Sequence, residues 1–200
     1  LLLLLSVAVA LSVIIAIVQA QPKPTGGSHG STRAAKRLMK ELQGFYESES
    51  HKNGVFTVEL INDNIYEWDV KVLKIDPDSE LHEGLQGLKK QGTRDYVLLR
   101  LVYDDNYPFS PPFVRVVYPD LASHAGAIMA GGLICTELLT EQGWSSSYTI
   151  EPLVLQLIAT MSGDAVVSGS FERYTYEQAK KEYDKYLGGD HKWSHTGKDG

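Results

Sequence analysis

Hydrophobic and polar positions follow different patterns in successive parts of the chain, beginning with a run that is apolar almost throughout. Residues 1–20 carry no charge, and as a helix they could just cross a bilayer of about 30 Å. A signal peptide is the competing interpretation, supported by the small residue Ala20, although no basic segment precedes the run. The Lys and Arg residues between positions 23 and 40, with no acid before Glu41, favour an anchor that keeps the remaining chain in the cytosol.

An amphipathic helix is predicted after this run. Residues 21–31 are dominated by Pro, Gly and Ser, which predicts a linker and a domain boundary. Over residues 33–45 apolar side chains recur at helical spacing, and Ser31 or Thr32 can cap the helix. The other side of this helix is basic, a pattern that by itself is typical of a solvated surface. Its basic residues are Arg33, Lys36, Arg37 and Lys40.

A period of two replaces the helical period after Gly54, and over residues 55–60 and 66–73 it predicts an antiparallel hairpin with one solvated face. The expected strands are residues 55–60, 66–73, 96–103 and 113–118. Between the second and third strands, residues 76–94 are polar and contain three glycines, so we expect a loop there. The prolines within residues 107–112 lack a backbone donor and must place that segment outside the sheet.

Helical spacing returns in the last part of the chain. Residues 150–161 predict an apolar helix, and residues 174–187 predict a charged helix opened by Glu172 and rich in tyrosine. One helix, four strands, an irregular stretch and further helices indicate an α+β fold. The folded domain is therefore expected over residues 32–188, followed by a loose polar tail at residues 189–200.

Composition limits the kinds of function. Two hundred residues, 43% of them hydrophobic, suit one domain with a core of its own. A net charge of -6 argues against nucleic-acid binding, which needs a basic face, and favours protein partners. The six histidines show no metal-ligand spacing with one another or with Cys135, and no glycine-rich phosphate motif follows a strand, so no metal or cofactor is expected.

Cys135 is the residue with the clearest candidate chemistry. It is the only cysteine of the chain, so it cannot form an internal disulfide and is either a packed thiol or a nucleophile. The apolar neighbours within residues 131–139 favour packing when this segment is taken alone. The segments on both sides of it change that balance.

Five motifs along the chain have the order and approximate spacing of ubiquitin-conjugating enzymes. They are Arg37-Leu38-Met39-Lys40-Glu41-Leu42, Asn64-Ile65-Tyr66-Glu67-Trp68, Tyr107-Pro108-Phe109-Ser110-Pro111-Pro112, Cys135 and Trp144-Ser145. Over roughly residues 32–188 the chain resembles this family, and around the cysteine it most resembles the Q-type branch. The resemblance implies the ubiquitin-conjugating (UBC-like) fold: an N-terminal helix, a four-stranded antiparallel meander and C-terminal helices.

The resemblance also implies a reaction. Cys135 would accept the carboxyl terminus of ubiquitin as a thioester from an activating enzyme, and a lysine amine or another nucleophile would then release it. A free thiol is already a few per cent thiolate at neutral pH, which suits an activated donor. ATP would be used by the activating enzyme, so the chain itself needs no cofactor. The implied partners are ubiquitin, the activating enzyme, ubiquitin ligases and protein substrates, in the cytoplasm, at the cytosolic side of a membrane or in the nucleus.

The largest departure from the family lies upstream of the cysteine. Most members have His-Pro-Asn there, and the asparagine donates to the oxyanion of the tetrahedral intermediate. This chain has Tyr118-Pro119-Asp120, with no asparagine after Asn106, and an ionised aspartate cannot donate. The alternative donors are His124, Ser123, Ser145 and a backbone N–H of the Gly131-Gly132 turn; an exposed loop residue is the competing interpretation of His124. The Q-type branch also lacks the motif, so its loss is compatible with activity.

The remaining site residues carry over from the resemblance. Contact with the activating enzyme is implied for Lys36, Arg37 and Lys40, and contact with ligases for Phe109, Ser146 and Ser147. Asp164 lies near the family's acidic gate for the incoming lysine, where Ser162 and Ser168 compete with it. Phe109 is equally compatible with the core, and Trp144 with packing beneath the cysteine loop. A non-catalytic module that binds ubiquitin or ligases on the same fold is the alternative function, favoured by the missing asparagine but not by the retained Cys135.

Overall fold

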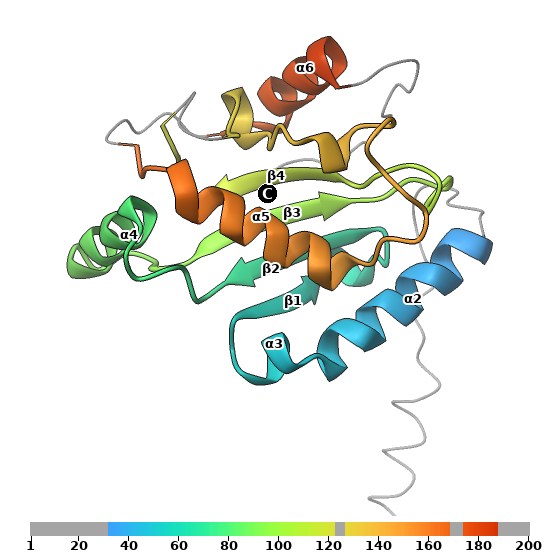
Figure 1. Ribbon diagram of the computed structural model, residues 1–200, viewed down its shortest axis with the longest axis horizontal. Coiled ribbons are helices and arrows are strands. Elements are labelled where there is room, and N and C mark those ends of the chain that lie inside the picture. The colour runs from blue at the N-terminus through green and yellow to red at the C-terminus, as the bar shows by residue number, and fades with distance from the viewer. Residues whose placement is uncertain (1–31, 123–126, 169–173, 188–200) are drawn as a thin grey trace, which may run out of the picture.

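The computed structural model describes residues 32–122, 127–168 and 174–187, and these form helices packed on one sheet (Figure 1). The helices are α2 (Thr32–Glu47), α3 (Glu49–Lys52), α4 (Glu80–Lys90), α5 (Ile150–Asp164) and α6 (Tyr176–Tyr186). The strands are β1 (Phe56–Leu60), β2 (Glu67–Val72), β3 (Val97–Val102) and β4 (Phe113–Tyr118). Short 3-10 turns lie at η1 (Ile61–Asp63), η2 (Ala130–Gly132) and η3 (Glu137–Leu139). The predicted α+β fold is confirmed.

The sheet is an antiparallel meander in the order β1-β2-β3-β4. Its register aligns Val58 with Val70, Val70 with Leu99 and Leu99 with Val116, so one face is continuously apolar. Figure 1 shows α5 lying across this face, and its buried side chains include Leu153, Leu157 and Met161. Burying a side chain of this size contributes about 1.5–3 kcal/mol. The larger of the two buried apolar clusters lies in this layer. The four strands and the apolar helix predicted from periodicity are therefore confirmed.

The opposite face of the sheet is polar over β1, β2 and the middle of β3, where ion pairs join the strands. Val102 and Phe113, on the same face, instead belong to a second buried apolar cluster with Tyr176 and Tyr183 of α6. Lys71 Nζ lies 2.8 Å from Glu59 Oε1, and Arg100 makes two hydrogen bonds of 2.9 and 3.1 Å to the carboxylate of Asp69. In β1 and β2 the polar residues alternate with the buried ones, as the period of two predicts. The partners lie on neighbouring strands, where opposite charges favour the observed register.

The loop predicted for residues 76–94 is wrong, because its centre is helix α4. Ser79 caps the helix and accepts a hydrogen bond from the backbone of His82 at 3.1 Å, while Leu81 and Leu85 are buried on one side. The glycines lowered the helical signal. Gly84, however, faces the core, where a Cβ would lie 2.6 Å from Cγ2 of Val167, so this glycine lets α4 approach the segment after α5.

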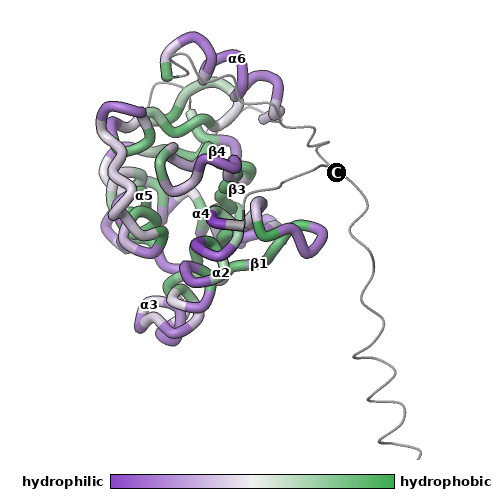
Figure 2. The backbone as a smooth tube through the Cα atoms, turned by 90° about the vertical axis from the view of Figure 1, so that its right-hand side faces the viewer, coloured by the Kyte–Doolittle hydropathy of each residue, from purple (hydrophilic) through white to green (hydrophobic). Residues whose placement is uncertain are grey.

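Helix α6 begins later than the sequence pattern suggests. Thr175 is its N-cap and forms a capping box with Gln178, so the predicted opening at Glu172 is wrong in position. Tyr176 and Tyr183 pack on Phe113 of β4, with ring centroids 5.9 and 5.4 Å away. Figure 2 shows the mostly hydrophilic α6 and α3 at opposite ends of the molecule.

Several predictions about the ends of the chain fall outside the described residues and side chains. They concern the anchor or signal-like segment at 1–20, the linker at 21–31, the side chain that caps α2, at Ser31 or Thr32, and the tail at 189–200. Within the part of the chain that is described, no helix has both the length and the apolar character to span a membrane.

Candidate functional site

Cys135 ends a short hairpin that runs antiparallel beside β4. Cys135 N donates to the carbonyl of Ala127 at 2.7 Å, and Met129 N donates to the carbonyl of Leu133 at 2.8 Å. Leu133 is buried and bridges to Arg115, whereas Cys135 is exposed. The interpretation of Cys135 as a packed thiol is therefore wrong, and the thiol is reachable from solvent.

Two glycines make the turn of this hairpin. Gly131 and Gly132 have φ of 69° and 78°, in the left-handed region that favours glycine. A Cβ on Gly131 would overlap the backbone nitrogen of Ala179 in α6, and one on Gly132 would overlap the carbonyl oxygen of Val116 in β4. The glycines therefore serve both the turn and its close packing between α6 and β4.

The segment after the cysteine folds over Trp144. Thr140 Oγ1 donates to the carbonyl of Glu137 at 2.8 Å and accepts from the backbone of Gly143 at 3.1 Å, which closes a compact turn. Trp144 is buried, and its Nε1 donates to the carbonyl of Pro108 at 2.8 Å. The predicted packing role of Trp144 is confirmed, and its indole joins the cysteine loop to the proline segment.

The segment that replaces His-Pro-Asn is held by residues that follow α5. Ala122 N donates to the carbonyl of Val166, and Ser168 N donates to the carbonyl of Asp120, both at 2.8 Å. The hydroxyl of Tyr174 donates to the carbonyl of Leu121 at 2.5 Å and accepts from the Leu121 amide at 2.8 Å. Hydrogen bonds to the residues after α5 and to Tyr174 thus hold this segment in place.

Tyr174 connects that segment to the cysteine hairpin. Its ring packs against Gly132, where a Cβ would lie 2.7 Å from Cδ2 of the tyrosine. Burial is the main reason that the pKa of Tyr174 rises to about 12; the hydrogen bond to Leu121 lowers this pKa and the charge of Asp120 raises it. The phenol is therefore neutral at physiological pH and can donate to Leu121. Sequence reasoning missed this residue, because a tyrosine in a predicted charged helix gives no sign of such a contact.

Of the two residues predicted to assist Cys135, the structure describes Asp164 but not His124. Asp164 is the exposed last residue of α5, and two residues later Val166 pairs with Ala122, so the chain after Asp164 joins the segment that replaces His-Pro-Asn. His124 and Ser123 lie outside the described residues, and their roles stay predictions.

The basic residues of α2 separate into two groups. Lys36 and Lys40 are exposed. Arg37 instead turns inward: its Nε donates to Glu41 Oε1 at 2.6 Å, its Nη1 to the carbonyl of Ser146 at 3.3 Å, and its Nη2 to the carbonyl of Tyr148 at 2.8 Å. The structure therefore does not place the three predicted contacts for an activating enzyme on one free surface.

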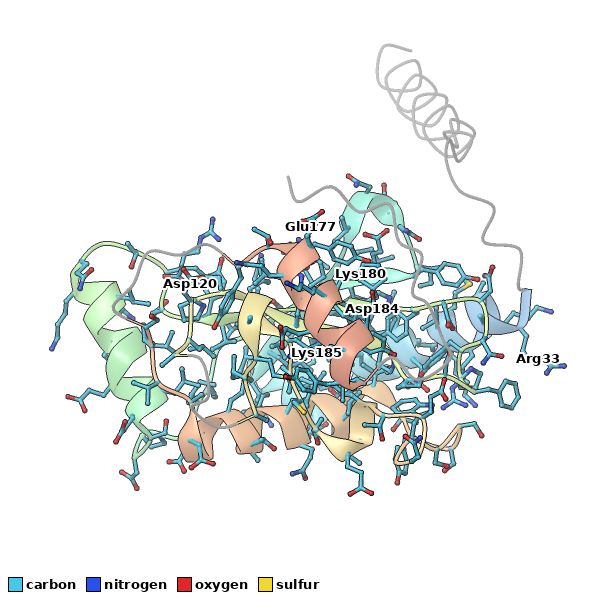
Figure 3. The ribbon with its side chains drawn as sticks, turned by 90° about the horizontal axis from the view of Figure 1, so that it is seen from above. Arg33, Asp120, Glu177, Lys180, Asp184 and Lys185 are labelled. Carbon is cyan, nitrogen blue, oxygen red and sulfur yellow. The ribbon has the colours of Figure 1, made fainter. Side chains whose placement is uncertain are left out.

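The predicted ligase-binding residues are brought together at the same end of the molecule as Arg37. Phe109 is 58% exposed, so the core interpretation is wrong, and the guanidinium carbon of Arg33 lies 5.9 Å from its ring centroid. Ser146 and Ser147 are exposed in the loop after Trp144, whose indole binds Pro108 next to Phe109. We call Phe109 with residues 145–149 the docking end, because the resemblance implies contact with ligases there. Figure 3 shows Arg33 and Asp120 on opposite sides of α6.

Metal binding has no geometric support in the described part of the chain, where no three His, Cys, Asp or Glu side chains are grouped to hold an ion. The chemistry that this arrangement offers is that of a solvent-accessible thiol at the end of a rigid hairpin, with a separate exposed aromatic and serine surface.

Comparison with known proteins agrees with the fold and the motifs. Residues 37–189 match the ubiquitin-conjugating enzyme family. Ubiquitin-conjugating enzyme E2 Q1 of Homo sapiens and of Mus musculus are each 47% identical over 168 residues, which is 82% of this chain and 39% of the relative. Ubiquitin-conjugating enzyme E2 25 of Caenorhabditis elegans is 45% identical over 137 residues, which is 68% of this chain and 35% of the relative.

A solved structure shares the fold at lower sequence identity. The crystal structure of a ubiquitin-conjugating enzyme E2 from Plasmodium falciparum superposes with a TM-score of 0.51 at 20% identity, covering 72% of this chain and 95% of the other. The chain spans about two fifths of the length of its E2 Q1 relatives. From the family match over residues 37–189 and the identity to the Q-type relatives, the chain belongs to the ubiquitin-conjugating enzyme family, in its Q branch.

Proposed function

We propose that this protein accepts ubiquitin as a thioester on Cys135 and transfers it to lysine or another nucleophile. The observation that carries the proposal is the exposed thiol at the end of the glycine hairpin, in a chain that belongs to the ubiquitin-conjugating enzyme family. The hairpin is fixed by its own hydrogen bonds and by α6, so the sulfur is presented on a rigid support.

The proposed reaction consists of two acyl transfers. The Cys135 thiolate attacks the thioester that joins ubiquitin to the activating enzyme; a new carbon–sulfur bond forms, the old one breaks, and the activating enzyme leaves as its thiolate. A neutral substrate amine then attacks the Cys135 thioester; the amide bond forms, the carbon–sulfur bond to Cys135 breaks, and the proton that the amine loses balances the thiolate that leaves. ATP is used in activating ubiquitin, before this protein takes part, so no cofactor is required on this chain.

Oxyanion stabilisation is the step for which this chain lacks the family's asparagine. The Gly132 N–H is directed to the carbonyl of Met129 at 3.1 Å, which argues against it as the donor. The hydroxyl of Ser145 is 2.8 Å from that of Ser147, so it is already paired within its loop. We keep His124 as the proposed donor, and Asp164, exposed at the end of α5, as the proposed gate for the incoming lysine.

The proposed partners are proteins that use two surfaces. Lys36 and Lys40, exposed on α2, would contact the acidic surface of an activating enzyme, whereas Arg37 is already engaged within the chain. Phe109, Ser146 and Ser147 would contact ligases at the docking end. With these partners, the proposed reaction takes place in the cytoplasm, at the cytosolic side of a membrane or in the nucleus.

The test is to incubate the protein with a ubiquitin-activating enzyme, ATP and ubiquitin, and to separate the products with and without reductant. We expect an adduct that reductant removes and that is absent in Cys135→Ala. Cys135→Ser is the matched variant, because a serine ester would resist reductant. The absence of any adduct with the wild-type protein and ubiquitin would contradict the proposal.

A non-catalytic module that binds ubiquitin or ligases is the second candidate. The observation that favours it is the absence of any asparagine after Asn106. Loss of one oxyanion donor costs on the order of 10²–10³ in rate, which slows a transferase without abolishing it. Ubiquitin binding by a wild-type protein that forms no adduct would support the module.

A further inference from the structure

Two rows of side chains run along helix α2 and have different environments. Arg33, Arg37 and Glu41 are spaced by four residues, so they lie on one side of the helix. Arg33 and Arg37 contact the docking end, at the Phe109 ring and at the loop carbonyls, and Glu41 contacts the first amide of α5, which directly follows the loop. The second row, Lys36 and Lys40, is exposed.

Arg37 is engaged by contacts within the chain through all three of its guanidinium nitrogens. All three of its guanidinium nitrogens donate, to Glu41 and to the carbonyls of Ser146 and Tyr148, and its side chain is 26% exposed. These two carbonyls lie on either side of Ser147, and a planar guanidinium can bind both only when the loop is bent. Arg37 therefore selects one shape of the loop that carries Ser146 and Ser147.

Glu41 connects the same arginine to helix α5. Its second oxygen, Oε2, accepts from the backbone amide of Ile150 at 3.1 Å, and this amide belongs to the first turn of α5, where no intrahelical partner exists. Glu41 is 7% exposed, so the charge of its carboxylate needs the arginine beside it. The pair thus joins α2, the loop and the start of α5 in one hydrogen-bonded unit.

We infer that Arg37 is a positioning residue that, through these contacts and Glu41, shapes the docking loop at residues 145–149 instead of contacting an activating enzyme. The inference rests on the proposed function for the use of that loop by ligases. The two sides of α2 then have different roles. The row of Arg33, Arg37 and Glu41 supports the docking end, and the row of Lys36 and Lys40 is available to the activating enzyme.

The first measurement is hydrogen exchange of the loop, which does not depend on activity. In Arg37→Lys and Arg37→Ala, the amides of Tyr148 and Ile150 should exchange about tenfold faster, since lysine keeps the charge but not the fork of donors. Glu41→Gln should change the same amides in the same direction. The amides of β2 should be unchanged, which controls for global unfolding.

The second measurement is the KM of the activating enzyme for this protein in thioester formation. Lys36→Ala with Lys40→Ala should raise the KM, while Arg37→Ala should leave it within about twofold. A rise in KM for Arg37→Ala equal to that of the lysine variants, or unchanged exchange of Tyr148 and Ile150, would overturn the inference. If the wild type forms no thioester, the proposed function fails, and the exchange measurement still decides whether Arg37 shapes the loop.

Discussion

The docking end and the cysteine end are stabilised by different kinds of contact, where the cysteine end is the hairpin of residues 127–135 with residues 118–122 and Tyr174. At the docking end, the guanidinium of Arg37 and the carboxylate of Glu41 bind backbone groups of the loop and of α5. At the cysteine end, glycines and backbone hydrogen bonds hold the structure, with a neutral phenol, Tyr174, as the main polar side chain. One end depends on ionised side chains, and the other on close backbone packing.

The two ends should tolerate substitutions to different extents. An exposed side chain such as Phe109 can be replaced at little cost, because little of its apolar area is buried, whereas replacing Arg37 would also leave the buried carboxylate of Glu41 without its cation. A hairpin whose turn lies directly against α6 and β4 has no space for an added atom. We therefore expect substitutions at the cysteine end to affect stability more than substitutions of exposed residues at the docking end.

The largest effect is expected for Gly132→Ala. The added Cβ meets both a positive φ and the carbonyl oxygen of Val116, so the free energy of unfolding should fall by about 3 kcal/mol. Urea unfolding measures this change. Gly163→Ala is the matched control, since a Cβ there meets nothing within 4 Å and the residue lies in α5, where alanine should add about 0.5–1 kcal/mol. Equal stability of the two variants would contradict the packing argument.

The sequence predicts those elements whose buried side chains recur at the period of a strand or a helix. The register of Val58, Val70 and Leu99 follows from a period of two, and α5 follows from its apolar side chains. Helix α4 was missed because its glycines mask the signal, and the reason for Gly84 is a contact with Val167 that only the tertiary structure supplies.

The sequence identified the exposed residues of the site, but not all of the contacts that hold it. Motifs identify Cys135 and Phe109, and the structure exposes both. The inward turn of Arg37 could have been suspected, because Glu41 follows it by four residues on the same helix side. The hydroxyl contact of Tyr174 with Leu121 could not, because 53 residues separate the two in sequence.

A smaller effect is expected for Tyr174→Phe, which removes the hydroxyl and keeps the ring against Gly132. Two hydrogen bonds to Leu121 are lost, and the free energy of unfolding should fall by about 1–2 kcal/mol. Tyr186→Phe, at an exposed position of α6, is the control and should change it by less than about 0.5 kcal/mol.

The stability difference between the wild type and Tyr174→Phe should depend on pH. In the folded protein the pKa of Tyr174 is about 12, above the value near 10 of an unfolded chain. Its contribution to stability is therefore complete below pH 10 and is lost as the pH rises from 10 towards 12. Urea unfolding at pH 8 and at alkaline pH should show a stability difference between wild type and Tyr174→Phe that narrows as the pH rises. A constant difference would exclude this linkage.

The smallest effect on stability is expected at the docking end, for Phe109→Ala. The ring is 58% exposed and its described cationic neighbour is Arg33, so little buried apolar area is lost and unfolding should change by less than about 0.5 kcal/mol. Thermal unfolding and thioester formation on Cys135 should both match the wild type. A loss of more than about 2 kcal/mol would show that Phe109 acts as a core residue despite its exposure, and it would remove the distinction between a tightly packed cysteine end and a tolerant docking end.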